Sequence, residues 1–178
     1  SDTVGDDIAL INGEDKLTWA SFDSKAAKIA TILEEHGLKS DSKVGIYLHN
    51  SNEYLEVQYG VFKIEGVPIN VNYRYKENEL VYLLDNSDAE AVFFQGCYAE
   101  RISAIKEQLP KVKVYIQIDD GTEPLMESAI DYENSISSSK EQIRFDRTED
   151  NIYMLYTGGT TGMPKGCLLY TSDAADEP

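Results

Sequence analysis

The sequence predicts an α/β fold in which helices flank a largely parallel sheet. From residue 44 onward, short apolar runs of strand length alternate with segments whose apolar residues recur at helical spacing. The chain has 178 residues, 42% of them hydrophobic, which suffices for one domain with a real core. A glycine- and threonine-rich loop follows the last strand-like run. In open α/β sheets, phosphate-binding loops lie just past the carboxyl ends of strands.

The first 37 residues predict a hairpin and then a helix. Asn12-Gly13 lies between two short apolar runs, 8–11 and 16–19, which is a hairpin signal. Helical spacing follows, and Gly37 is the expected stop. His36 falls at the helix C-terminus, where a cation is favoured, so we interpret it as a capping or surface residue. The helical apolar positions are Phe22, Ala26, Ile29, Ala30 and Leu33.

The middle of the chain predicts crossover units, each a strand followed by a helix. Ser51 or Asn52 is the expected N-cap of one helix, because short polar side chains accept backbone N–H groups there. Pro68 is tolerable only near the start of its strand or at an edge. The expected strands are 44–48, 67–71, 91–94 and 112–118, and the expected helices are 54–64, one starting near Glu77, and 98–109.

After residue 118 the pattern is weaker. We expect a turn over 119–124, a helix over 125–136 and an exposed loop over 137–141. The run 152–156 is apolar and short, so it predicts a buried strand that leads into the glycine- and threonine-rich loop.

That loop, residues 156–166, reads Tyr-Thr-Gly-Gly-Thr-Thr-Gly-Met-Pro-Lys-Gly. Glycine lets backbone N–H groups approach an anion closely, threonine adds hydroxyl donors, and Lys165 adds a mobile charge. The composition favours a phosphate cradle over a plain turn. A Walker A loop is excluded because Lys165 is followed by Gly166 rather than Ser or Thr, and no G-x-G-x-x-G string occurs here.

The loop resembles the phosphate-loop signature of adenylate-forming enzymes, the acyl-CoA synthetase and ligase superfamily, whose usual string is YTSGTTGxPKG. Every fixed position agrees except Gly158, where the family usually has serine. One hydroxyl is therefore missing, although the backbone N–H remains. The resemblance implies that the loop holds the β- and γ-phosphates of ATP. The residues implied are Thr157, Gly158, Gly159, Thr160, Thr161, Gly162 and Lys165.

The resemblance extends over roughly residues 5–166, in the family's expected order. Leu17-Thr18-Trp19-Ala20 is similar to its opening segment, and residues 66–72 are similar to its strand-to-loop segment. The segment Tyr73-Arg74-Tyr75 is most similar to that of acyl-CoA synthetases that act on fatty or steroid-side-chain acids. The alternative is that Tyr73 and Tyr75 are simply a pair of tyrosines packed at the surface. The implied fold is the N-terminal part of the family's large domain.

The implied chemistry has two steps, with ATP, Mg²⁺ and coenzyme A taking part. A carboxylate attacks the α-phosphorus of Mg-ATP, and the CoA thiolate then displaces AMP from the acyl-adenylate. Positioning and charge neutralisation dominate such a displacement. No side chain in the sequence is a credible nucleophile or general base, because neither His36 nor His49 has a partner visible in the sequence. We therefore predict no catalytic residue in this chain.

The net charge of −16 argues against nucleic acid and anionic membranes as partners. Cys97 and Cys167 lack a metal-ligand spacing, so we expect neither a metal site nor a disulfide framework. With no secretory signal and no apolar run of about 20 residues, the expected location is the cytoplasm.

The residues after Gly166 depart from the family. Residues 167–178 are similar to the translation of a transposase sequencing adapter, and we hypothesise that this tail is not native. A genuine divergent tail is the alternative, and resequencing across Gly166 separates the two. We expect residues 1–166 to be a truncated N-terminal AMP-binding domain. The family's later motifs are absent, so we expect the 178-residue polypeptide itself to be inactive.

Two other classes of function stay open. One is an ATP-binding or phosphotransfer protein with an unrelated phosphate loop, which would release ADP rather than AMP and pyrophosphate. The other is a non-enzymatic interaction domain whose acidic face binds a basic partner. Loss of nucleotide binding on Lys165→Ala would count against the second class.

Overall fold

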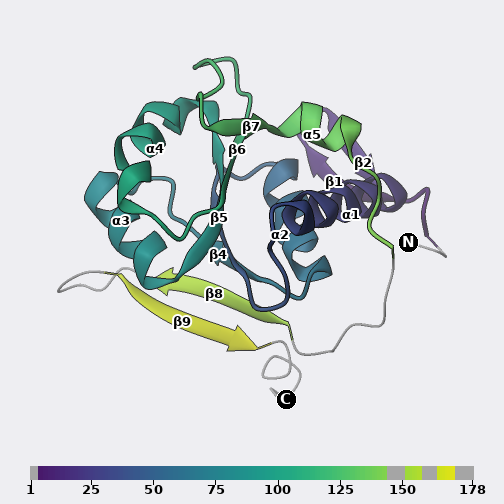
Figure 1. Cartoon of the computed structure of the whole chain (residues 1–178). Coiled ribbons are helices and arrows are strands. Elements are labelled where there is room, and N and C mark those ends of the chain that lie inside the picture. The colour runs from purple at the N-terminus through teal and green to yellow at the C-terminus, as the bar shows by residue number, and fades with distance from the viewer. Residues whose placement is uncertain (1–3, 144–150, 158–163, 171–178) are drawn as a thin grey trace.

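The computed structural model describes residues 4–143, 151–157 and 164–170, and in them the chain forms a seven-stranded sheet with helices on both faces (Figure 1). The strand order is β7-β6-β5-β3-β4-β8-β9, with β9 antiparallel and every other pair parallel. The predicted α/β class is confirmed. The sheet strands are β3 (Lys43–Tyr47), β4 (Val67–Asn70), β5 (Ala89–Gln95), β6 (Val114–Ile118), β7 (Ala129–Asp131), β8 (Ile152–Thr157) and β9 (Lys165–Tyr170).

The helices divide the apolar core into two layers. Helices α1 (Trp19–Glu35), α2 (Asn52–Lys63) and α5 (Tyr132–Ser138) cover one face of the sheet, and α3 (Glu77–Asn86) and α4 (Ala99–Ile105) cover the other (Figure 1). Short 3₁₀ turns, η1 (Gly96–Tyr98) and η2 (Lys106–Gln108), flank α4. Successive residues of β5 therefore serve different layers, with Phe93 under α1 and α2, and Phe94 under α3 and α4.

The N-terminal hairpin is a separate two-stranded sheet, as predicted. Strand β1 (Ile8–Asn12) pairs with β2 (Asp15–Thr18), and Gly13 takes the left-handed conformation, φ 62°, that the turn requires. Thr18 then caps α1 by accepting the Ser21 N–H at 3.2 Å. At the other end His36 is the C-cap, and its Nδ1 lies 2.8 Å from the Ile32 carbonyl oxygen.

The start of α2 also follows the sequence, because Ser51 accepts the Tyr54 N–H at 3.3 Å. Pro68 lies at the second residue of β4, a strand with neighbours on both sides. Val67 and Val71 donate their N–H groups to the carbonyls of Ser42, just before β3, and of Ile46 in β3, so the alternate position without an N–H faces β8. Pairing with β8 begins only at Ile69, and the proline therefore removes no ladder bond.

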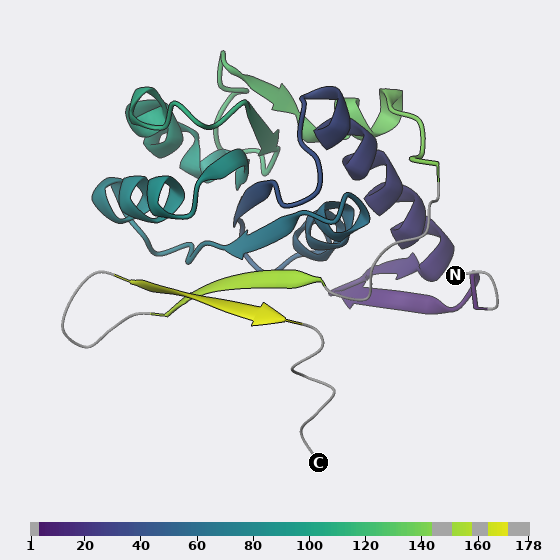
Figure 2. The same cartoon turned by 60° about the horizontal axis from the view of Figure 1, so that its bottom comes forward.

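Two predictions in the last third of the chain are wrong. Residues 125–136 are not one helix: β7 adds an edge strand beside β6, and α5 starts only at Tyr132 and runs through Ser138, into the predicted loop. Asp131 sets that start, because its carboxylate accepts the Asn134 N–H at 2.7 Å. Strand β8 is half-buried rather than buried, since the strand beyond it in the sheet is the exposed β9 (Figure 2).

A buried carboxylate joins the three helices of the first face. Glu56 of α2 is fully buried, and its two oxygens accept from Lys25 of α1 at 3.0 Å and from the Tyr132 hydroxyl of α5 at 2.5 Å. Burial, reinforced by this carboxylate, raises the pKa of Tyr132, so the phenol remains a donor. A buried charge is tolerated only when hydrogen bonds surround it, and here two helices supply them.

Tyr132→Phe is expected to lower the free energy of unfolding by about 1–3 kcal/mol, because it leaves one oxygen of buried Glu56 without its donor. Urea denaturation measures this change. Tyr59→Phe is the matched control, since the Tyr59 side chain is exposed, and it should change stability by less than about 0.5 kcal/mol. Equal costs for the two variants would contradict the role given to Glu56.

Candidate functional site

The connections that leave the carboxyl ends of β3 and β4 diverge. The chain leaving β3 enters α2 on one face of the sheet, whereas the chain leaving β4 enters α3 on the other. Strand β5 then pairs with the opposite side of β3. Such a reversal of strand order opens a crevice between the two strand ends, the place where open α/β sheets bind ligands.

A pocket of about 350 Å³ occupies this crevice. Leu48 and Asn50 follow β3, while Asn70 ends β4, and Tyr156 comes from β8. Val71, Asn72 and Tyr73 continue from β4, and Tyr54 of α2 completes the wall. Among the described residues that line it, none is a lysine or an arginine, so the pocket is neutral and mixes amides, phenols and apolar surface.

The two described residues of the predicted phosphate site meet beside this pocket. Thr157 ends β8, Lys165 begins β9, and the two are register partners in the antiparallel pair. Both are exposed. The pairing therefore brings a hydroxyl and an ammonium to the same carboxyl edge of the sheet as the pocket. The other predicted binding residues, Gly158, Gly159, Thr160, Thr161 and Gly162, lie outside the described residues.

A glycine is required at position 166 because the ring of Tyr156, its register partner on β8, leaves too little room for a side chain. A Cβ built on Gly166 would lie 3.1 Å from Tyr156 Cζ, which is tighter than an ordinary contact. The Tyr156 hydroxyl donates to Asn86 Oδ1 of α3 at 2.9 Å, so the ring is tied to the neighbouring helix. Tyr54 and Tyr153 connect β8 to α2 through hydroxyls 3.0 Å apart. Strand β8 is thus anchored to a helix on each face, just before the residues of the predicted phosphate site.

The histidines have partners in the structure, although the sequence showed none. His49 Nε2 lies 2.8 Å from the Tyr98 hydroxyl, and His36 contacts its own helix. Burial raises the pKa of Tyr98 to about 12, so it remains a phenol at neutral pH. The absence of a catalytic role for either histidine stays a prediction.

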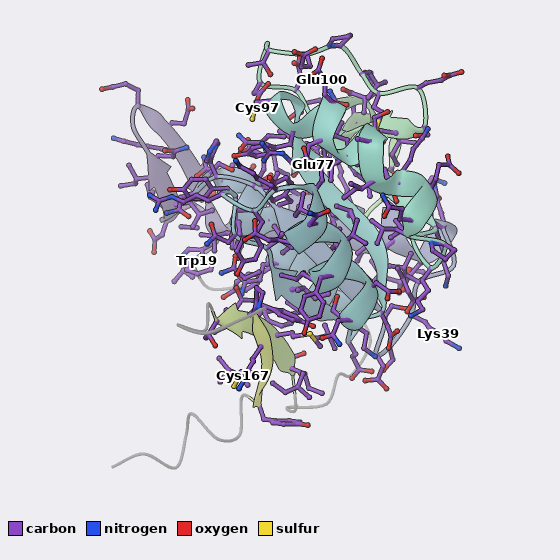
Figure 3. All side chains as sticks on the ribbon, turned by 90° about the vertical axis from the view of Figure 1, so that its left-hand side faces the viewer. Trp19, Lys39, Glu77, Cys97, Glu100 and Cys167 are labelled. Carbon is purple, nitrogen blue, oxygen red and sulfur yellow. The ribbon has the colours of Figure 1, made fainter. Side chains whose placement is uncertain are left out.

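No group of three or more His, Cys, Asp or Glu residues is placed to hold a metal ion in the described part of the chain. Cys97 and Cys167 are both free and lie far apart in Figure 3. None of the helices within the described ranges has the length and apolar character needed to cross a bilayer. A larger, shallower groove of about 480 Å³ runs along α4. Its described lining includes Glu100, Glu123 and Glu127 but no lysine or arginine, which does not suit a triphosphate.

Comparison with known proteins decides the family. The AMP-binding enzyme family matches residues 1–175. The chain belongs to that family. The predicted resemblance, carried by the residue 156–166 string, is thereby confirmed.

The relatives of this AMP-binding family member include CoA ligases. The 3-oxocholest-4-en-26-oate–CoA ligase of Rhodococcus rhodochrous is 40% identical over 175 residues, which are 97% of this chain and 32% of that protein. The medium/long-chain-fatty-acid–CoA/3-oxocholest-4-en-26-oate–CoA ligase of Mycolicibacterium smegmatis is 38% identical, with the same coverage. The chain thus spans about a third of the length of these relatives.

Solved structures share the fold of this AMP-binding family member. The anthranilate CoA ligase AuaEII, in complex with anthranoyl-AMP, aligns with a TM-score of 0.88 at 21% identity, covering 96% of this chain and 33% of that one. ATP-bound MatB from Rhodopseudomonas palustris aligns with a TM-score of 0.75 at 23% identity, covering 90% and 31%. At these identities the likeness shows the fold alone.

The sequence did not point to most of the pocket. Asn50, Tyr54 and Tyr156 come from three separate segments, and only the sheet brings them together. The available signal was position, since the polar residues Asn50 and Asn72 lie shortly after the ends of β3 and β4.

Gly166→Ala is expected to loosen the β8–β9 hairpin by about 1 kcal/mol, because the new Cβ displaces the Tyr156 ring. Amide hydrogen exchange in β8 and β9 should then be roughly fivefold faster. The matched control places the same substitution in a Tyr156→Leu background, where the ring is gone and the added cost should largely disappear. An equal cost in both backgrounds would rule out the Tyr156 contact as its cause.

Proposed function

We propose that the protein containing this chain activates a carboxylic acid with ATP, first to an acyl-adenylate and then to an acyl-CoA thioester. The observation that carries the proposal is the meeting of Thr157 and Lys165 at the carboxyl edge of the sheet, within the family's signature string. The CoA ligases among the relatives support the same activity.

In the first step an oxygen of the substrate carboxylate attacks the α-phosphorus of ATP, and the bond to the pyrophosphate oxygen breaks. The residues of this chain contribute by holding the departing pyrophosphate. Lys165 supplies a positive charge, and the hydroxyl of Thr157 and the backbone N–H groups of the glycines and threonines that follow supply donors. These donors would bind the phosphate oxygens of a magnesium-bound nucleotide. Mg²⁺ takes oxygen ligands and would enter the site bound to the nucleotide.

In the second step the CoA thiolate attacks the acyl carbon, and the bond to the AMP oxygen breaks. We propose a fatty acid or an acid with a steroid side chain as the substrate. The support is the substrates named for the two relatives and the Tyr73-Arg74-Tyr75 segment, which resembles synthetases of that class. Residues 1–166 form the N-terminal part of the AMP-binding domain in this proposal, and the tail after Gly166 is assigned as non-native.

Lys165→Ala in the full-length protein is expected to slow exchange of labelled pyrophosphate into ATP by about 100-fold, because one charged donor to the leaving group is lost. Calorimetry should show weaker ATP binding as well. Lys16→Ala is the matched control, since it removes a lysine from the separate β1–β2 sheet, and its exchange rate should stay at the wild-type value.

Product analysis in the same assay separates the rival class. AMP with pyrophosphate supports adenylation, whereas ADP supports a phosphotransfer protein with an unrelated loop. Nucleotide binding that is indifferent to Lys165→Ala would favour a non-enzymatic acidic interaction domain and would refute the proposal.

A further inference from the structure

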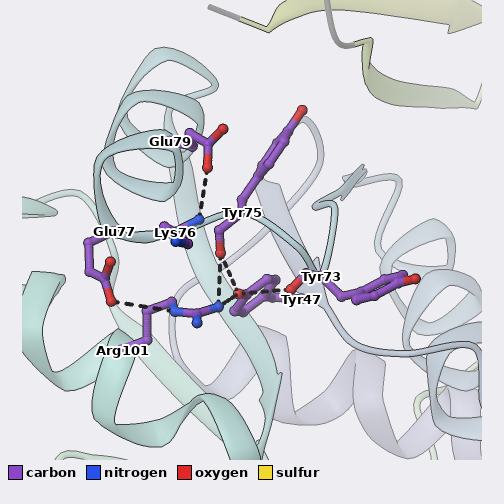
Figure 4. Close-up of polar contacts among 7 residues, drawn as sticks. All are labelled: Tyr47, Tyr73, Tyr75, Lys76, Glu77, Glu79 and Arg101. Atoms are coloured by element: carbon purple, nitrogen blue, oxygen red, sulfur yellow. Dashed lines mark hydrogen bonds and ion pairs between the residues drawn. The ribbon is translucent and has the colours of Figure 1, made fainter.

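The loop from residue 72 to 76, which forms one wall of the pocket, is tied down from beneath (Figure 4). The Tyr47 hydroxyl, at the end of β3, donates to the Tyr75 carbonyl at 2.8 Å and lies 3.2 Å from the Tyr73 carbonyl. Tyr47 is fully buried, and burial raises the pKa of its phenol, so the hydroxyl keeps its proton at neutral pH. One buried donor thus holds two carbonyls of the same loop.

Arg101 of α4 completes this anchor. Its Nη1 donates to the Tyr47 hydroxyl at 2.6 Å and to the Tyr75 carbonyl at 2.9 Å. Its Nε lies 3.5 Å from a Glu77 oxygen, at the first turn of α3 (Figure 4). The guanidinium therefore spans the end of β3, the loop and the start of the next helix. The planar fork of arginine suits three such partners, whereas an ammonium on a flexible stem does not.

The two ends of the loop are fixed independently. At the entry, the Val71 N–H donates to the Ile46 carbonyl at 3.1 Å, and the Tyr75 N–H donates back to Asn72 at 2.9 Å. At the exit, the Glu79 carboxylate accepts the Lys76 N–H at 2.9 Å. Between these points, Tyr47 and Arg101 supply the contacts that fix the height of the loop over the sheet.

The position of the loop determines the shape of the pocket, because its residues Asn72 and Tyr73 line the pocket wall. The Tyr73 ring is 41% exposed and packs on the His49 ring, with centroids 4.8 Å apart. His49 in turn is held by the Tyr98 hydroxyl, and the Tyr98 ring packs on Tyr47 at 4.2 Å. The tyrosine that faces the pocket and the tyrosine that anchors the loop therefore belong to one packed cluster.

We propose that Arg101 is a positioning residue that holds the 72–76 loop, and thereby the Asn72 and Tyr73 wall of the pocket, in the geometry that receives the uncharged chain of an organic substrate. The pocket is lined by neutral side chains in the described residues, which suits an uncharged chain and not a triphosphate. Both the proposed acid and the thiol substrate carry such a group, and the kinetic test below distinguishes them. The inference rests on the proposed function for the identity of these substrates, but not for the position of the loop.

The first test is amide hydrogen exchange of the full-length protein, which needs no activity. In Arg101→Lys, exchange at residues 71–76 should accelerate about tenfold, while that of β5 and β6 stays unchanged. Tyr47→Phe is the second variant; it keeps the ring and removes the shared hydroxyl, and it should accelerate the same peptide. Lys106→Gln is the matched control, because it removes a cation directly after α4 that contacts Ser128 and not the loop. It should leave residues 71–76 unchanged.

The second test is steady-state kinetics on the same variants. Arg101→Lys should raise the KM for either the acid or CoA about tenfold, with kcat and the KM for ATP within about twofold of wild type. Which of the two KM values rises identifies the substrate that the pocket receives. Tyr73→Ala should raise the same KM, and the double variant should be no worse than Tyr73→Ala alone, because both changes act through one wall.

Unchanged exchange at residues 71–76 in both Arg101→Lys and Tyr47→Phe would overturn the proposal. So would KM values for both the acid and CoA that stay at wild type, or effects of Arg101→Lys and Tyr73→Ala that simply add. Failure of the proposed function has a different signature, since the wild-type protein would then form no AMP, and the exchange experiment would still decide whether Arg101 holds the loop.

Discussion

The divergence of the chain after β3 and β4 is the constraint on which the rest of the site depends. Because the two strands send their connections to opposite faces, the chain segments that leave their carboxyl ends diverge and leave a crevice between them. Strand β8 then pairs with β4 and delivers Thr157 to the same edge. A single topological step therefore places a neutral pocket beside the residues predicted to hold phosphate.

The two helical layers hold the strands that frame this crevice, and the polar contacts differ between the layers. The layer of α1, α2 and α5 contains a buried ionic contact at Glu56, whereas the layer of α3 and α4 meets the loop through Tyr47 and Arg101. Strand β8 lies outside both layers for much of its surface. Hydroxyl contacts from Tyr54 to Tyr153 and from Tyr156 to Asn86 compensate by tying it to one helix on each side.

Local patterns in the sequence predicted most of the fold. Asn12-Gly13, the Ser51 cap and the alternation of apolar runs with helical spacing act over a few residues, and the structure follows them. The prediction failed at residues 125–136, where a three-residue edge strand depends on β6, a partner that the local sequence does not reveal. The loop string was readable because its chemistry is contained in eleven consecutive residues. The pocket could not be predicted from the sequence, because the loop that forms its wall is held by contacts between distant residues. Arg101 and Tyr47, for example, are 54 positions apart.

In the proposed reaction the carboxylate attacks the α-phosphorus while the loop holds the departing pyrophosphate. Turnover of the full-length protein with an acid labelled with ¹⁸O in its carboxyl group tests this directly, by mass analysis of the products. We expect one ¹⁸O atom in AMP, because the attacking oxygen remains on phosphorus when the thiolate displaces AMP from the acyl carbon. Label in inorganic phosphate, with ADP as the nucleotide product, would contradict it.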